Sequence, residues 1–121
     1  MTQRWLAVVA LVGCLGGCSG KPERPLQIQG TVTSIGYDRP VPNAEVIVEW
    51  PPSLGGGSVT VKTDRKGHYV LGRTVRADSL DCTGTVITVR ASGFASAYNQ
   101  SSGNCSAGLL SEDFKLFPTP G

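Results

Sequence analysis

Four cysteines and a single histidine are the residues of this 121-residue sequence best suited to chemistry. The cysteines are Cys14, Cys18, Cys82 and Cys105. The histidine is His68, and Asp64 precedes it by four residues within one predicted turn. A Ser/His/Asp triad needs a histidine that is oriented by a buried acid, which a surface turn does not provide. A metal site on Cys82 and Cys105 would have only His68 as a further soft ligand. We therefore expect no catalytic residue, no metal and no cofactor.

The first two cysteines follow an apolar leader. One positive charge precedes an uninterrupted apolar run over residues 5–12. That run is too short to span a membrane and fits the hydrophobic part of a secretory signal. The next segment, Leu15-Gly16-Gly17-Cys18, resembles a bacterial lipobox, in which the cysteine is acylated on sulfur and becomes the mature N-terminus. The resemblance implies a signal peptide over 1–17, a lipid on Cys18 and a tether over 18–25.

A second string of the same kind is Leu11-Val12-Gly13-Cys14. Cleavage before Cys14 would leave an apolar segment of about six residues, against about 7–15 in most signals. It would also leave Cys18 as an odd thiol. An ordinary signal peptide with incidental cysteines is a third interpretation. Cys18 fits the segment length and the cysteine count best, and Cys14 stays open as the alternative.

The balance of charge limits the partners. Eleven basic and nine acidic residues give a net charge of +2, without the clustered basic face that nucleic-acid binding requires. No basic cluster follows Cys18 that would attract lipid headgroups, so membrane attachment would depend on the acyl chains. We expect a location in the bacterial cell envelope. In a Gram-negative source this would be the outer membrane, facing the periplasm or the surface. The residue after the cysteine is Ser19, and not the aspartate that resembles an inner-membrane retention signal.

From Leu26 onward the apolar residues recur with a period of two, and turn-forming strings separate short segments. This pattern, without helical spacing, predicts an all-β fold, a seven-stranded β-sandwich over 26–117 with a tail over 118–121. Ile47 breaks the polar side of its strand. The predicted strands cover 26–32, 44–50, 59–62, 68–71, 85–91, 94–98 and 113–117.

Cys82 and Cys105 fall in loop-like sequence between predicted strands. Export places both in an oxidising compartment, where cysteines pair. We predict a Cys82–Cys105 disulfide, which would contribute about 3 kcal/mol by restricting the unfolded chain. Two free buried thiols and metal ligation are the alternatives.

Four short motifs occur in the order found in carboxypeptidase regulatory-like domains, and together they resemble that family from Leu26 to Leu116. The motifs are Gly30-Thr31-Val32 with Pro42-Asn43-Ala44-Glu45-Val46, then Thr63-Asp64-Arg65-Lys66-Gly67-His68-Tyr69, then Ala91-Ser92-Gly93-Phe94, and Asp113-Phe114-Lys115-Leu116. The resemblance implies a transthyretin-like, Ig-like sandwich.

The motif residues have structural roles that can be stated in advance. Asp64 can accept backbone amide hydrogen bonds within a turn, and Gly67 can adopt the positive φ that the turn needs. Tyr69 is expected in the core with its polar tip bonded, and Gly93 permits a tight bend. His68 is expected to be exposed.

Three aromatic residues could bind a partner if their rings are exposed. Trp50 shares parity with Val46 and Val48, which favours the core; an exposed ring would stack on a sugar or anchor a protein. Tyr37 and Tyr98 lie next to turns, where binding surfaces often gather. We expect a non-catalytic envelope lipoprotein that serves as an interaction or accessory module for an envelope protein partner. The alternative is a stand-alone carbohydrate- or peptide-binding module that uses these aromatic residues.

Overall fold

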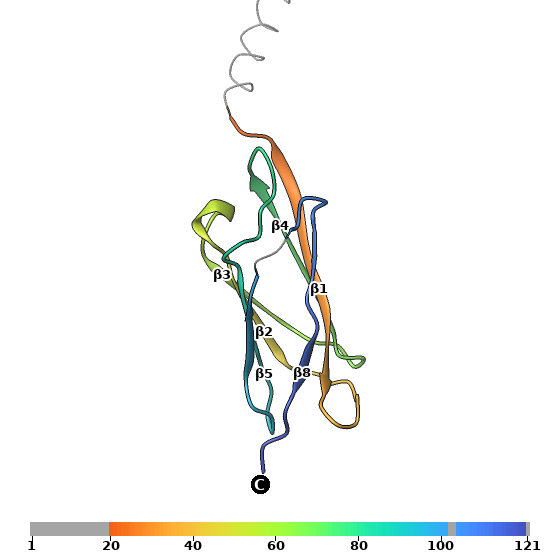
Figure 1. The fold of residues 1–121 in the computed structure, drawn as a ribbon. Helices are drawn as coiled ribbons and strands as arrows, with labels where there is room; N and C mark the ends of the chain where they lie inside the picture. Colours follow the sequence, from red (N-terminus) through yellow and green to blue (C-terminus); the bar gives the residue numbers. More distant parts are fainter. Residues whose placement is uncertain (1–19, 102–103, 121) are drawn as a thin grey trace, which may run out of the picture.

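The structure is a computed structural model, and it describes residues 20–101 and 104–120. Within them two four-stranded β-sheets form a sandwich whose strands run along the long axis of the domain (Figure 1). The predicted all-β sandwich is confirmed, with eight strands in place of seven. The elements are β1 (Glu23–Ser34), β2 (Glu45–Glu49), η1 (Pro52–Leu54), β3 (Ser58–Lys62), β4 (His68–Arg76), β5 (Val86–Arg90), β6 (Ala97–Gln100), β7 (Leu109–Ser111) and β8 (Phe114–Leu116).

The first sheet is built around β1, which is twelve residues long. On one side β1 pairs with β4 in antiparallel register, from Glu23 opposite Arg76 to Thr31 opposite His68. On the other side it pairs in parallel, first with β7 and then with β8. One long strand thus holds two short C-terminal strands in succession.

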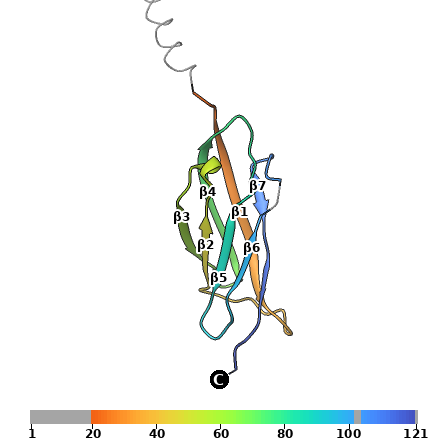
Figure 2. The same cartoon turned by 60° about the vertical axis from the view of Figure 1, so that its left-hand side comes forward.

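The second sheet has the order β3-β2-β5-β6 and is antiparallel throughout (Figure 2). The tip between β2 and β3, residues 51–57, contains the 3₁₀ turn η1. Three consecutive glycines follow it with positive φ, a conformation that residues with a side chain rarely adopt. Residues 51–57 thus form the tip of the antiparallel β2–β3 hairpin.

The core lies between the two sheets and follows the predicted alternation. Val46 and Val48 of β2 and Ile28 and Val32 of β1 are all fully buried and belong to one core cluster. Side chains of this size stabilise a fold by about 1.5–3 kcal/mol each when fully buried. The period-two pattern of the sequence therefore identifies the inward residues of the long strands correctly.

Three strands differ from expectation. β7 has no counterpart among the predicted strands, because only Leu110 of its three residues points inward. β4 extends to Arg76, beyond the predicted end at Leu71, because Gly72 and the half-buried Arg73 interrupt the apolar alternation. β6 begins at Ala97, and Phe94 forms an isolated bridge with Pro118 instead.

The N-terminal boundary also differs from expectation. β1 begins at Glu23, so residues 23–25 of the predicted tether pair with β4. The proposed signal peptide over 1–17, Cys14 and Cys18 lie outside the described residues. Within residues 20–101 and 104–120, the structure contains no helix with the length and apolar character to cross a bilayer.

Candidate functional site

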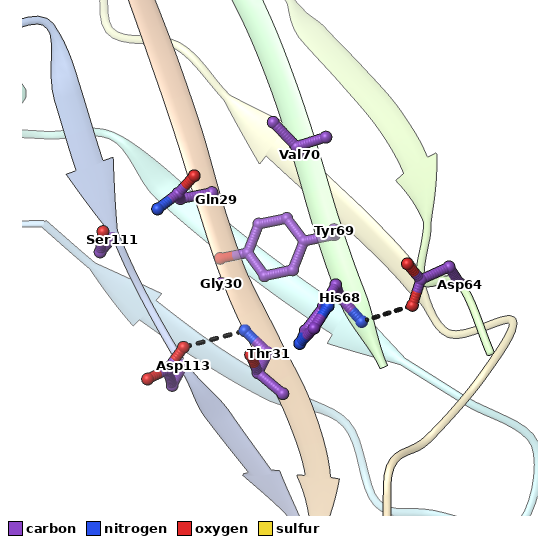
Figure 3. A pocket seen from close by; sticks show the side chains of 9 residues that line it. All are labelled: Gln29, Gly30, Thr31, Asp64, His68, Tyr69, Val70, Ser111 and Asp113. Atoms are coloured by element: carbon purple, nitrogen blue, oxygen red, sulfur yellow. Dashed lines mark hydrogen bonds between the residues drawn. The ribbon is translucent and has the colours of Figure 1, made fainter. Parts of the chain in front are cut away.

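A shallow groove lies on the first sheet where β1 changes its parallel partner from β7 to β8, and it has a volume of about 470 Å³ (Figure 3). The Glu112 amide donates to the Gln29 carbonyl at 2.9 Å. The Thr31 amide donates to Asp113 Oδ1, also at 2.9 Å. The Asp113 carboxylate thus takes the place of a backbone carbonyl in the ladder, so the amide of Thr31 keeps a partner across the change of strands.

Gly30 is required at the centre of this groove by its surroundings. A Cβ built on Gly30 would overlap the Glu112 carbonyl oxygen and lie 2.8 Å from Cε1 of Tyr69. The Tyr69 ring fills the space beside the glycine (Figure 3), and its hydroxyl donates to the same Glu112 oxygen at 2.6 Å. Tyr69 is 3% exposed, so its predicted role as a core residue with a bonded polar tip is confirmed.

The Tyr69 phenol is held in its protonated form. Burial raises its pKa well above the ordinary value, and the nearby carboxylates of Glu112 and Asp113 raise it further. At neutral pH the hydroxyl is therefore a hydrogen-bond donor and not a base or an anionic ligand.

The opposite side of the groove is a turn closed by Asp64. Asp64 Oδ1 accepts hydrogen bonds from the His68 and Lys66 amides, both at 2.9 Å, and Gly67 adopts a φ of 78°. The His68 amide, followed by that of Lys66, lowers the pKa of the Asp64 carboxyl below its ordinary value of 3.8. The roles predicted for Asp64 and Gly67 are confirmed.

His68 is exposed at the first position of β4, as expected, and lies in register with Thr31. No hydrogen bond links its imidazole to a carboxylate in the described part of the chain. Nowhere in residues 20–101 and 104–120 do three His, Cys, Asp or Glu side chains converge as metal ligands would. The groove offers hydroxyl, amide, imidazole and carboxylate groups that can hydrogen-bond to a ligand.

Trp50 lies in the core, at 6% exposure, where its parity with the buried residues of β2 predicts it. The Arg73 guanidinium lies 4.9 Å from the centroid of its ring. Arg73 Nη1 also donates to the carbonyls of Leu54 at 3.2 Å and Gly56 at 2.9 Å. Because a cation held by the hairpin tip covers the ring, Trp50 is removed from the candidate binding residues.

Tyr37 and Tyr98 are both exposed, at 76% and 74%. Tyr37 lies in the turn after β1, with the Arg39 guanidinium 5.6 Å from its ring centroid. Tyr98 lies on β6, opposite Thr88 of β5. The structure places the two rings on different elements, and neither lines the groove.

Cys82 and Cys105 form the predicted disulfide, with their Cα atoms 5.8 Å apart. Both cysteines lie outside the strands, as expected, and are 0% and 1% exposed. The bond joins the segment between β4 and β5 to the loop between β6 and β7. The alternatives of free thiols and of metal ligation do not hold for this pair.

Two features of the site were missed from the sequence. One is the cation–π cover of Trp50 by Arg73, for which the sequence carries no signal. The other is the crowding of Gly30 by Glu112 and Tyr69. A glycine at an inward position of an alternating strand signals a close approach of backbone, so Gly30 was open to prediction.

Comparisons with known proteins yield a fold likeness only. No family model matches the chain, and no curated protein is similar to it in sequence. Among solved structures, a chlorocatechol 1,2-dioxygenase from Pseudomonas putida is similar with a TM-score of 0.58 and 16% identity, over 78% of this chain and 61% of that one. A 3-chlorocatechol 1,2-dioxygenase from Rhodococcus opacus 1CP is similar with a TM-score of 0.58 and 12% identity, over 84% of this chain and 62% of that one. The chain therefore spans less than two thirds of either enzyme.

Proposed function

We propose that the protein is a non-catalytic lipoprotein of the bacterial cell envelope, a membrane-anchored β-sandwich that serves as an interaction or accessory module. The observation that carries this proposal is how the four cysteines divide. Cys82 and Cys105 are joined in a buried disulfide, a bond that persists in exported proteins. Cleavage before Cys18 then leaves one unpaired cysteine, at the position that the lipobox-like string assigns to the lipid.

The non-catalytic part of the proposal rests on the bonds that the groove residues already make. Asp64 accepts two turn amides, Asp113 accepts the Thr31 amide, and the Tyr69 hydroxyl donates to a backbone carbonyl. A general acid or base must be free to exchange a proton with a substrate. These groups instead stabilise the turn and the change of strand partners.

The proposed domain type is the carboxypeptidase regulatory-like one. The motif residues support it, because Asp64, Gly67 and Tyr69 have the conformations and bonds that their positions in the motif require. Domains of this architecture serve many roles, so the proposed function depends on the anchor and on the exposed surface more than on the fold.

The proposed anchor holds the domain close to the bilayer. Five residue steps separate Cys18 from Glu23 at the start of β1, and a fully extended chain of that length spans about 18 Å. The N-terminal end of β1 would therefore face the membrane, and the turn after Ser34 would face away from it. In a Gram-negative source the proposed membrane is the outer one.

Metabolic labelling with a clickable fatty acid tests this proposal in cells that express the full chain. We expect label on the wild-type protein and on Cys14→Ala, and none on Cys18→Ala. An unlabelled wild-type protein would contradict the anchor. Label that survives in Cys18→Ala but not in Cys14→Ala would move the lipid to Cys14.

A further inference from the structure

The outer face of the second sheet carries a row of side chains that the rest of the described chain leaves uncovered. Ile47 points outward because its neighbours Val46 and Val48 are fully buried, and it is only half-buried itself. Figure 2 shows the four strands of this sheet with no other strand in front of them. Across β3, β2, β5 and β6 the row in register is Thr60, Ile47, Thr88 and Tyr98.

The corresponding face of the first sheet exposes apolar side chains on its flanking strands, Val70 of β4 and Leu109 of β7, but its central strand β1 is polar there. At its centre Gln29 of β1 lies between Val70 of β4 and Ser111 of β7. The side chains of Gln27 and Gln29 hydrogen-bond to each other at 3.1 Å. The second sheet therefore differs in its central strand, which carries an outward isoleucine where the central strand of the first sheet carries glutamines. Aromatic and apolar side chains at the centre of a face are typical of protein contacts.

We propose that this face is the contact between two copies of the chain, related by a two-fold axis parallel to the strands. Such an axis places β2 of one copy over β5 of the other, and β3 over β6. Ile47 then packs on Thr88 of the second copy, and Thr60 packs on its Tyr98. The contact is self-complementary, as a two-fold interface must be.

The charges on the face select this axis. Glu45 Oε1 and Arg90 Nη2 are 3.6 Å apart, and the two side chains are 46% and 57% exposed. Both can therefore form an ion pair with a second partner. The axis parallel to the strands places Glu45 of each copy opposite Arg90 of the other. An axis in the same plane but perpendicular to the strands would place Glu45 opposite Glu49, and like charges would repel.

The anchor selects the same axis, and this step rests on the proposed function. The strands run along the long axis of the domain (Figure 1). A parallel two-fold axis therefore leaves both Glu23 ends on the same side, where two tethers can enter one bilayer. A perpendicular axis would separate these ends by about the length of β1, roughly 40 Å for twelve residues. A tether of about 18 Å would not span that distance.

Cross-linking of the full chain in the envelope tests the contact. Ser58→Cys with Gln100→Cys places two thiols in the row next to Ile47, three strand spacings or about 14 Å apart within one chain. In the proposed dimer the new thiol at position 58 of each copy would face the new thiol at position 100 of the other. A short bis-maleimide should then give a product of twice the chain mass. Either single variant should give little of it, and so should the control Val70→Cys with Ser111→Cys, whose two outward positions lie in one row of the first sheet.

A third substitution makes the result specific. Ile47→Lys should reduce the product at least tenfold, because it places a cation in the contact, while Glu45 and Glu49 on the same strand accommodate it in the single chain. Monomer alone, a product with a different protein, or a dimer only through the first-sheet control would overturn the proposal. The fatty-acid label is read on the same samples. Label without a dimer refutes the contact and leaves the anchor, and a dimer without label refutes the anchor and leaves the contact.

Discussion

The two sheets of the sandwich differ in whether their distinctive side chains have partners within the chain. In the first sheet, the crossing from β7 to β8 is fixed by Gly30, Tyr69 and Asp113, and the Tyr69 hydroxyl and the Asp113 carboxylate are bonded within the chain. On the second sheet, Ile47 and Tyr98 face outward without such partners among the described residues. The strand crossing of the first sheet is thus satisfied within the chain, whereas the outward isoleucine of the second sheet belongs to the face proposed to contact a second copy.

The largest expected effect comes from removing the Cys82–Cys105 disulfide, which links segments between the two sheets. The disulfide ties the β4–β5 segment to the β6–β7 loop, so each of its ends joins a strand of the first sheet to one of the second. Replacing Cys82 and Cys105 together by alanine should lower the free energy of unfolding by about 3 kcal/mol on the chain-entropy model. Urea denaturation measures this loss, and a change below about 1 kcal/mol would contradict it.

The next prediction concerns a substitution that affects the first sheet alone. Gly30→Ala should destabilise the domain by about 3 kcal/mol, because the new methyl group overlaps backbone at Glu112. Gly72→Ala is the matched control on the paired strand, where the nearest atom to a new Cβ is the Leu26 carbonyl oxygen at 3.4 Å. Thermal unfolding should separate the two variants clearly. Equal melting temperatures would refute the account of the groove.

A pair of tyrosines sharpens the comparison between the faces. Tyr69→Phe should cost about 1–2 kcal/mol, because the Glu112 carbonyl loses its buried donor. Tyr98→Phe should change the free energy of unfolding by less than about 0.5 kcal/mol, because that ring is exposed. Denaturant titration of both variants measures the difference, which should vanish only if the Tyr69 bond is not formed in solution.

The smallest effect concerns the turn beside the groove. The folded-state pKa of Asp64 lies below its ordinary value of 3.8, so ionised Asp64 stabilises the fold fully above about pH 5. This contribution is lost as the pH falls through the folded pKa. Wild type should therefore exceed Asp64→Asn in stability at pH 7, with a smaller difference at pH 3. A difference that grows on acidification would have the wrong sign.

Sequence reasoning succeeded where the physics is local. The alternation around Val46 and Val48 and the Asp64 turn depend on neighbouring residues, and the pairing of Cys82 with Cys105 was predicted from their loop-like positions and the cysteine count. The groove instead joins Thr31 to Asp113 across 82 positions, and no local pattern encodes such a meeting.

The outer face of the second sheet could also be predicted only in part from the sequence. The sequence already reveals Ile47 as an apolar residue on a polar side, but its meaning depends on the neighbours that the sheet brings beside it. The register of four strands aligns it with Thr88 and Tyr98. That register arises from pairings between distant segments, which one sequence does not specify.

The most direct test of the central claim compares one substitution on each face in living cells. Ile47→Lys and Val70→Lys both place an ammonium group on an outward position of a strand, and Val70 is 59% exposed. After formaldehyde treatment, a complex formed by the wild-type protein should be lost in Ile47→Lys and kept in Val70→Lys. A complex that survives Ile47→Lys, or that only Val70→Lys abolishes, would contradict it.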